Sequence, residues 1–112
     1  MAVIAVLTNL PDSESAFNLA RDLVHLRLAA CVNVLSPVTS FYRWDGKDEE
    51  AVEVPVLIKS TRERYCELEA AIRARHPHCL PEVVAWPLEG FPAYLSWVEA
   101  ECQSAVAPSL RA

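Results

Sequence analysis

Along the first quarter of the chain, hydrophobic residues change from a continuous run to a helical spacing. Residues 3–7 are all apolar and rich in β-branched side chains, which is typical of a strand buried on both faces. A polar loop follows, and Asp12 or Ser13 is well suited to cap the start of a helix. Apolar residues then recur at helical spacing, at Ala16, Ala20, Leu23 and Val24. The pattern predicts a strand, a loop over residues 9–13 and a helix that ends near Leu28.

The second quarter of the chain predicts a long β-hairpin. Residues 30–44 read as an extended segment interrupted by a proline, and Asp45-Gly46 is a strong signal for a two-residue hairpin turn. Over residues 52–59 the side chains alternate with a period of two, as expected for a strand with one face toward the core. Pro55 has no backbone N–H, so it marks an edge, a bulge or a change of pairing partner.

Two more helices and one strand are predicted in the remaining sequence. Residues 60–63 have the S-x-x-E form of a capping box, and the helix that they begin ends at Pro77. The inward positions of this helix are Tyr65, Leu68, Ala71 and Ile72. Residues 82–86 read as a short strand, and Pro92 suits the first turn of a third helix. The buried side of the third helix is expected to carry Phe91, Leu95, Val98 and Cys102.

The predicted order of elements is β-α-β-β-α-β with a C-terminal helix. This is the α+β, ferredoxin-like arrangement, in which a four-stranded antiparallel sheet carries helices on one face. The chain has 112 residues, a length typical of one domain, so we expect a single domain over residues 1–112. Its last part, residues 104–112, is expected to fray.

The predicted hairpin is too long for the helices that would cover it. Strands of about 14 residues span roughly 46 Å, whereas a helix of about 15 residues spans roughly 22 Å. The overhanging tip carries Phe41, Tyr42 and Trp44, which would expose an apolar patch to water. We therefore expect an oligomer in which a neighbouring subunit pairs with the hairpin, with Tyr42 and Trp44 at the interface.

Composition and charge exclude several classes of protein. Hydrophobic residues make up 53% of the chain and charged residues 22%, which excludes a disordered segment. The formal net charge of −5 argues against nucleic acid as a partner, and no apolar run approaches the roughly 20 residues of a membrane span. The apolar start has no basic segment before it, so we interpret it as a strand rather than a signal peptide and expect a cytoplasmic protein.

The four cysteines, Cys31, Cys66, Cys79 and Cys102, lie far apart in the sequence and form no C-x-x-C pair. A cytoplasmic chain with this much apolar content does not need disulfides. We therefore predict four free thiols, with Cys31 as an unreactive thiol in the core.

Several stretches of the sequence resemble one family, the CutA divalent-cation-tolerance family. They are Ala29–Asn33, Ser40–Lys47, Glu53 with Lys59 after it, His76-Pro77, Pro81-Glu82 and Tyr94–Trp97. The resemblance extends over nearly the whole chain, and the stretches stand in the same order as in the family. It implies a homotrimer of ferredoxin-like subunits whose long strands pair across subunit boundaries, an architecture similar to that of PII signalling proteins. It also implies tolerance of divalent metals, copper binding in some members, and no catalysed reaction.

Two histidines and a cysteine, His76, His78 and Cys79, form the candidate metal site. Imidazole and thiolate ligands suit copper or zinc. The copper sites that the resemblance implies use a cysteine and a histidine pair, but Thr8 and Arg75 stand at two of these positions here. A structural metal site needs four ligands, and the sequence supplies no fixed fourth partner here, so we expect any divalent metal to bind more weakly than in a four-ligand site. The alternative is a loop in which one histidine caps the preceding helix.

A second candidate site consists of Glu53, Lys59, His76 and Glu82. Carboxylate, ammonium and imidazole groups in a cleft between subunits would hold a small anion or zwitterion. The alternative interpretation is an ion pair at the interface that fixes the strand register.

From the sequence we expect a non-enzymatic, cytoplasmic trimer that takes part in the response to divalent metal ions. The first alternative is a PII-like sensor that binds a small metabolite or nucleotide in the clefts between subunits. The second is a small enzyme such as an acylphosphatase. That activity needs a phosphate-binding loop after the first strand, and residues 8–12 contain neither arginine nor glycine, so it ranks last.

Overall fold

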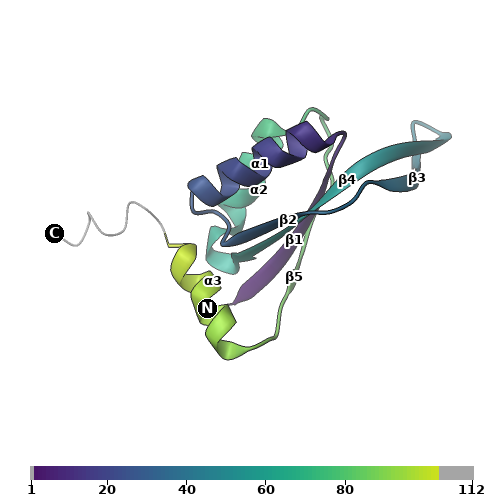
Figure 1. The fold of residues 1–112 in the computed structure, drawn as a ribbon. Helices are drawn as coiled ribbons and strands as arrows, with labels where there is room; N and C mark the ends of the chain where they lie inside the picture. The colour runs from purple at the N-terminus through teal and green to yellow at the C-terminus, as the bar shows by residue number, and fades with distance from the viewer. Residues whose placement is uncertain (1, 104–112) are drawn as a thin grey trace.

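The computed structural model of the chain describes residues 2–103 (Figure 1). The elements in order are β1 (Val3–Leu10), α1 (Ser13–His25), β2 (Cys31–Val34), β3 (Val38–Trp44), β4 (Lys47–Thr61), the 3₁₀ helix η1 (Arg62–Arg64), α2 (Tyr65–Arg75), β5 (Val83–Pro87) and α3 (Pro92–Glu101). This order confirms the predicted α+β, ferredoxin-like fold. The segment that was expected to fray, residues 104–112, lies outside the described residues.

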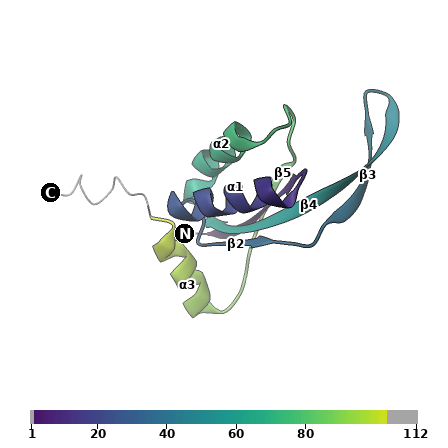
Figure 2. The same cartoon turned by 45° about the horizontal axis from the view of Figure 1, so that its top comes forward.

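The strands form one antiparallel sheet in the order β2-β4-β1-β5, and β3 pairs with the first half of β4. Helices α1 and α2 lie on one face of the sheet, whereas α3 lies on the other side near the start of β1 (Figures 1 and 2). Much of the opposite face is therefore left without a helix. We call this the open face, and its apolar residues are Leu7, Leu57, Val84 and Trp86.

Alternate residues of β1 and β4 build the core against α1 and α2. The buried strand residues are Ile4, Val6, Leu10, Val54, Val56 and Ile58, and the buried helix residues are Ala16, Leu19, Leu23, Leu68 and Ile72. This is the period of two that the sequence predicted for β4. Because burial of one large aliphatic side chain is worth about 1.5–3 kcal/mol, this shared layer holds the sheet and both helices together.

The hairpin of β3 and β4 extends beyond the helices, as predicted (Figure 2). Asp45 and Gly46 form its turn with φ angles of 54° and 75°, the two positive values that a type I′ turn requires. The molecule measures 55 × 28 × 24 Å, and its radius of gyration of 15.2 Å exceeds the roughly 13 Å of a compact domain of this length. The overhang makes the single chain elongated.

Helix α1 is shorter than predicted. It ends at His25 rather than near Leu28, and Arg27 adopts a left-handed conformation with φ 61°. The Leu28 N–H donates to the Leu23 carbonyl over 3.0 Å, which closes the helix in a Schellman motif. Such a turn usually has glycine at the left-handed position, so an arginine there carries no local signal for the helix end.

The predicted capping box is wrong. Ser60 remains in β4, which pairs with β1 as far as Thr61, and α2 begins only at Tyr65. The Ser60 hydroxyl donates to the Leu28 carbonyl over 2.7 Å instead of capping a helix. Strand β1 likewise reaches Leu10, into the predicted loop, because it pairs along this whole length with β4.

Helix α3 packs against the start of β1 through a second apolar cluster. Val98 and Cys102 are buried there with Val3, and Leu95 packs against them. Phe91, which was expected on the same side, is 74% exposed. It precedes the first helical turn and therefore lies outside this cluster.

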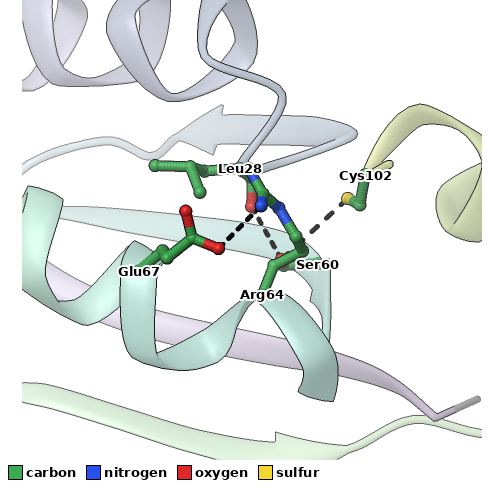
Figure 3. Close-up of polar contacts among 5 residues, drawn as sticks. All are labelled: Leu28, Ser60, Arg64, Glu67 and Cys102. Atoms are coloured by element: carbon green, nitrogen blue, oxygen red, sulfur yellow. Dashed lines mark hydrogen bonds and ion pairs between the residues drawn. The ribbon is translucent and has the colours of Figure 1, made fainter. Parts of the chain in front are cut away.

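Buried polar groups connect the end of β4 to α3 (Figure 3). The Cys102 thiol lies 3.9 Å from the Ser60 hydroxyl, and burial raises the pKa of this thiol. Beside it, the largely buried guanidinium of Arg64 donates to Glu67 over 2.7 Å. The loop after α1, the end of β4 and the end of α3 therefore meet at one buried point.

Candidate functional site

A cavity of about 850 Å³ lies between the hairpin and the loop that follows α2. Its lining residues come from the end of β1, the hairpin and the loop: Asn9, Ser40, Phe41, Tyr42, Trp44, Glu53, His76, His78, Cys79, Leu80, Pro81 and Glu82. Three of the four residues expected in the cleft line this cavity, together with both expected interface aromatics and all three expected metal ligands. This size is typical of a small-molecule site.

His76 fixes one wall of the cavity. Its Nε2 lies 2.6 Å from the Asn9 carbonyl, and its Nδ1 accepts from the His78 backbone N–H over 3.1 Å. Because Nδ1 is an acceptor, Nε2 carries the proton and donates to Asn9. Both ring nitrogens are therefore engaged in hydrogen bonds within the chain.

Asn9 joins the end of β1 to the loop through two different groups. Its carbonyl accepts from His76, and its Nδ2 donates to Glu82 Oε1 over 3.0 Å. The sequence analysis placed Asn9 in a loop and did not select it. An asparagine at a strand end carries no signal by itself, so only the fold identifies its part in the site.

Within one chain, Lys59 lies apart from the other residues that were expected in the cleft between subunits. It lies on the same side of β4 as Glu53 but six positions further along, roughly 20 Å at the usual strand rise. Its Nζ donates to Asn33 of β2, at the other end of the sheet. Within one chain the structure therefore brings together Glu53, His76 and Glu82 and leaves Lys59 apart.

The expected metal ligands lie near one another but do not form a ligand set. The His76 and His78 rings are 5.2 Å apart between centroids, and Cys79 is exposed. Among residues 2–103, no three His, Cys, Asp or Glu side chains form a group that could hold a metal ion. With both nitrogens of His76 engaged, the donors of one chain do not fit a resident copper or zinc ion. Thr8, which stands where the resemblance implies a copper-binding cysteine, is fully buried.

The aromatic residues of the hairpin are largely open to solvent. Tyr42 is 47% exposed and Trp44 51% exposed, although each lines the cavity with part of its surface. In the described part of the chain, β4 pairs with β1 only over residues 54–61. Residues 47–53 pair with β3 alone, so one edge of this stretch is free.

The open face adds a second apolar surface that the sequence analysis did not identify. Val84 and Trp86 of β5 both point to this face and are less than two-thirds buried. Residues 82–86 were predicted only as a short strand, with no face assigned to its side chains. The sequence nevertheless indicates that Val84 and Trp86 share one face of the strand, since they occupy alternate positions.

All four cysteines are free in the structure. Cys102 is buried, but Cys31 is only half-buried and lies opposite Lys59, on the open face. The interpretation of Cys31 as a core thiol was therefore wrong. Cys31 adjoins Tyr94 of α3. Burial, and to a smaller extent the Cys31 thiol, raise the pKa of the Tyr94 hydroxyl.

No helix among residues 2–103 is both long and apolar enough to cross a membrane.

Comparison with known proteins gives a consistent match over most of the chain. Residues 4–101 match the family described as CutA1 divalent ion tolerance protein. The divalent-cation tolerance protein CutA of Thermus thermophilus is 43% identical over 94 residues, which cover 83% of this chain and 91% of that protein. A CutA homolog of Xenopus laevis is 42% identical over 95 residues, which cover 84% of this chain but only 63% of that protein.

Solved structures give the same result. The divalent cation tolerance protein Cut A1 of Thermus thermophilus has a TM-score of 0.88 and 39% sequence identity to this chain. The match covers 90% of this chain and 99% of that structure. The similarity in fold and the similarity in sequence therefore point to the same family over most of the chain.

Proposed function

Because the chain belongs to the CutA1 divalent ion tolerance family, we propose that it acts as a non-catalytic homotrimer in the response to divalent metal ions. The family match over residues 4–101 carries this role. The family is named for tolerance of ions rather than for a reaction, which supports a protein without catalysis.

The hairpin and the open face support assembly into a trimer. The free edge of β4 over residues 47–53 presents unpaired backbone groups that a neighbouring strand can bind. Tyr42 and Trp44 extend from this hairpin, and Val84 and Trp86 lie exposed on the open face. Three copies in a ring would close such head-to-tail contacts and bury these side chains.

Direct metal contact is assigned to His78 and Cys79, since both nitrogens of His76 are engaged within the chain. Two ligands from one chain hold an ion more weakly than a complete four-ligand site. We therefore expect metal binding by one chain to be weak.

Growth and titration together test the metal role. In a host that lacks its own copy of such a protein, expression of this chain is expected to raise the copper concentration that the cells survive. Isothermal titration with copper and with zinc is then made on the wild type and on a His78→Ala, Cys79→Ser variant. A His25→Ala, Cys66→Ser variant is the matched control, because both residues are on helix surfaces outside the cavity.

Each measurement tests a different part of the proposal. No gain in copper tolerance would overturn the metal-response role itself. Unchanged metal binding in the His78→Ala, Cys79→Ser variant would move the contact to other residues. Loss of binding without loss of tolerance would show that tolerance is indirect.

We infer a cytoplasmic location from the four free thiols, since disulfides are rare in that compartment. Cell fractionation followed by thiol counting in denaturant tests this. Recovery in an exported fraction, or fewer than four reactive thiols, would contradict it.

The cavity supports a second candidate function, that of a PII-like sensor for a small molecule. A volume of about 850 Å³ with mixed aromatic and polar lining is suited to a metabolite. Ligand bound in this cavity after purification without added small molecules would support the sensor.

A further inference from the structure

On the basis of the metal role proposed above, we propose that Asn9 is the positioning residue for the metal contact of His78 and Cys79. These two residues lie in the loop of residues 76–82, which connects α2 to β5. Asn9 lies at the end of β1 and acts on this loop rather than on the ion, because it fixes the loop at both of its ends.

Asn9 bonds to the first and to the last residue of the loop. Its backbone carbonyl lies 2.6 Å from Nε2 of His76, and its Nδ2 donates to Oε1 of Glu82 over 3.0 Å. Within residues 2–103, no other side-chain hydrogen bond joins the loop to the rest of the chain. One strand residue therefore closes the loop, and we call these two bonds the Asn9 anchor.

The strands around Asn9 hold it in place. β1 pairs with β4 on both sides of Asn9, and its two neighbours, Thr8 and Leu10, are buried. The ladder between β1 and β5 ends at the pair of Thr8 and Val83. Just beyond this last pair, the Asn9 carbonyl accepts from a side chain of the loop instead of from a strand. The anchor therefore rests on a rigid element, which is what a residue that positions a site requires.

The bond to His76 also determines where His78 lies. Nδ1 of His76 accepts from the His78 backbone N–H over 3.1 Å, so the imidazole links the Asn9 carbonyl to the backbone of His78. Cys79 follows directly in the sequence and is exposed. Two ligands bind an ion more tightly when their relative position is fixed beforehand, because less conformational freedom is lost on binding. Loss of the anchor should therefore weaken the metal contact although neither ligand has changed.

The anchor does not depend on the neighbouring subunits. Each of its hydrogen bonds joins two groups of the same chain. Neither bond involves the hairpin, whose aromatic side chains and free strand edge are expected to be covered in the trimer. The role of Asn9 therefore applies to the assembled protein.

Amide hydrogen exchange of the assembled, full-length protein measures the anchor without any metal. Asn9→Leu keeps the approximate size of the side chain but removes the donor to Glu82. We expect the amides of residues 78–80 to exchange roughly tenfold faster, because a hydrogen bond to a carboxylate is lost. Asn18→Leu on α1 is the matched control, since it also removes an asparagine side chain that forms a hydrogen bond, and it should leave these amides unchanged.

A reversed pair of side chains tests the hydrogen bond itself. Asn9→Asp alone places two carboxylates together and should loosen the loop, since neither can donate. When Asn9→Asp is combined with Glu82→Gln, a donor and an acceptor face each other in reverse order, so exchange should return toward the wild-type rate. Glu82→Gln alone keeps an oxygen acceptor for Asn9 and should change exchange less than Asn9→Leu does.

Isothermal titration with copper and with zinc measures the consequence for the ion. Asn9→Leu should weaken binding by roughly three- to tenfold, whereas Asn18→Leu should not. A merely stabilising role would lower the midpoint of urea unfolding but leave the affinity for metal unchanged.

The outcomes distinguish the anchor from the metal role. Unchanged exchange of residues 78–80 in Asn9→Leu, or no recovery in the double variant, overturns the anchor and leaves the metal role in place. Faster exchange with unchanged metal affinity shows that Asn9 holds the loop without positioning the contact, which also overturns the proposal. If the assembled wild type binds neither copper nor zinc, the direct metal contact is overturned, and the positioning role with it.

Discussion

At the scale of single residues, His76 ties the loop after α2 to the end of β1. Both of its ring nitrogens are used, one toward the Asn9 carbonyl and one toward the His78 N–H. We expect His76→Ala to lower the free energy of unfolding by about 1–2 kcal/mol, since it leaves a partly buried carbonyl without its donor. The midpoint of urea unfolding at fixed protein concentration measures this.

His78→Ala is the control for this prediction, because it leaves the bond between His76 and the Asn9 carbonyl in place. It is expected to change the unfolding midpoint little. Equal effects of the two substitutions would show that the histidine pair, rather than the bond to Asn9, stabilises the loop.

A second residue-scale prediction concerns pH. The Ser15 backbone N–H, and then its hydroxyl, lower the pKa of the Asp12 carboxyl below its ordinary value of 3.8. A lowered pKa means that folding favours the ionised carboxylate, so its stabilising effect is present above pH 3.8 and is lost as the pH falls through the lower folded value. The stability advantage of wild type over Asp12→Ala should therefore shrink in acid.

Unfolding by urea across an acidic pH series checks the direction. Asp12→Asn supplies the comparison, because an amide oxygen can also cap the helix but does not titrate here. Its advantage over Asp12→Ala should stay constant with pH. An advantage of wild type that grows in acid would contradict the assigned cause.

At the scale of elements, Ser60 joins three parts of the fold. Its hydroxyl donates to the Leu28 carbonyl after α1 and lies beside the Cys102 thiol at the end of α3. We expect Ser60→Ala to destabilise the protein by about 1–2 kcal/mol, because a buried carbonyl loses its partner. Amide hydrogen exchange should also quicken in α3, and Ser96→Ala on the exposed side of α3 is the control. Unchanged exchange in α3 would contradict the link between these elements.

The same serine shows what the sequence could and could not predict. The period of two in β4, the Asp45-Gly46 turn and the apolar spacing of α1 are local patterns, and each predicted its element correctly. The role of Ser60 depends on the Leu28 carbonyl, which is distant in sequence. The local capping motif therefore led to the wrong prediction that Ser60 caps a helix. The separation of Lys59 from Glu53 likewise follows from strand length and pairing rather than from side-chain alternation. Most of the fold was therefore predictable, whereas only part of the candidate site was.

At the scale of the whole molecule, the elongated single chain predicts that assembly and stability are linked. We expect Trp44→Ala to weaken the trimer by about 2 kcal/mol per interface, the range of an aromatic anchor at a protein interface. Sedimentation equilibrium over a concentration series measures this. Phe17→Ala is the matched control, because Phe17 is 47% exposed but lies on α1, away from the hairpin.

Dissociation should also be accompanied by partial unfolding of the hairpin, since its free strand edge and exposed aromatics lack partners in one chain. Circular dichroism on dilution would follow the loss of strand. A wild-type protein that sediments as a fully folded monomer of 12.4 kDa would contradict the trimer.

The pairing of β1 with β4 has a consequence for how the chain folds as it is made. β1 is synthesised before both strands that it pairs with, since its register joins Val3 to Thr61 and Leu10 to Val54 of β4, and its other neighbour, β5, comes later still. The apolar run of residues 3–7 therefore stays unpaired until residues 54–61 have been synthesised. A nascent chain stalled before β4 emerges should expose this run to chaperones, and release of the chaperone should coincide with the synthesis of residues 54–61.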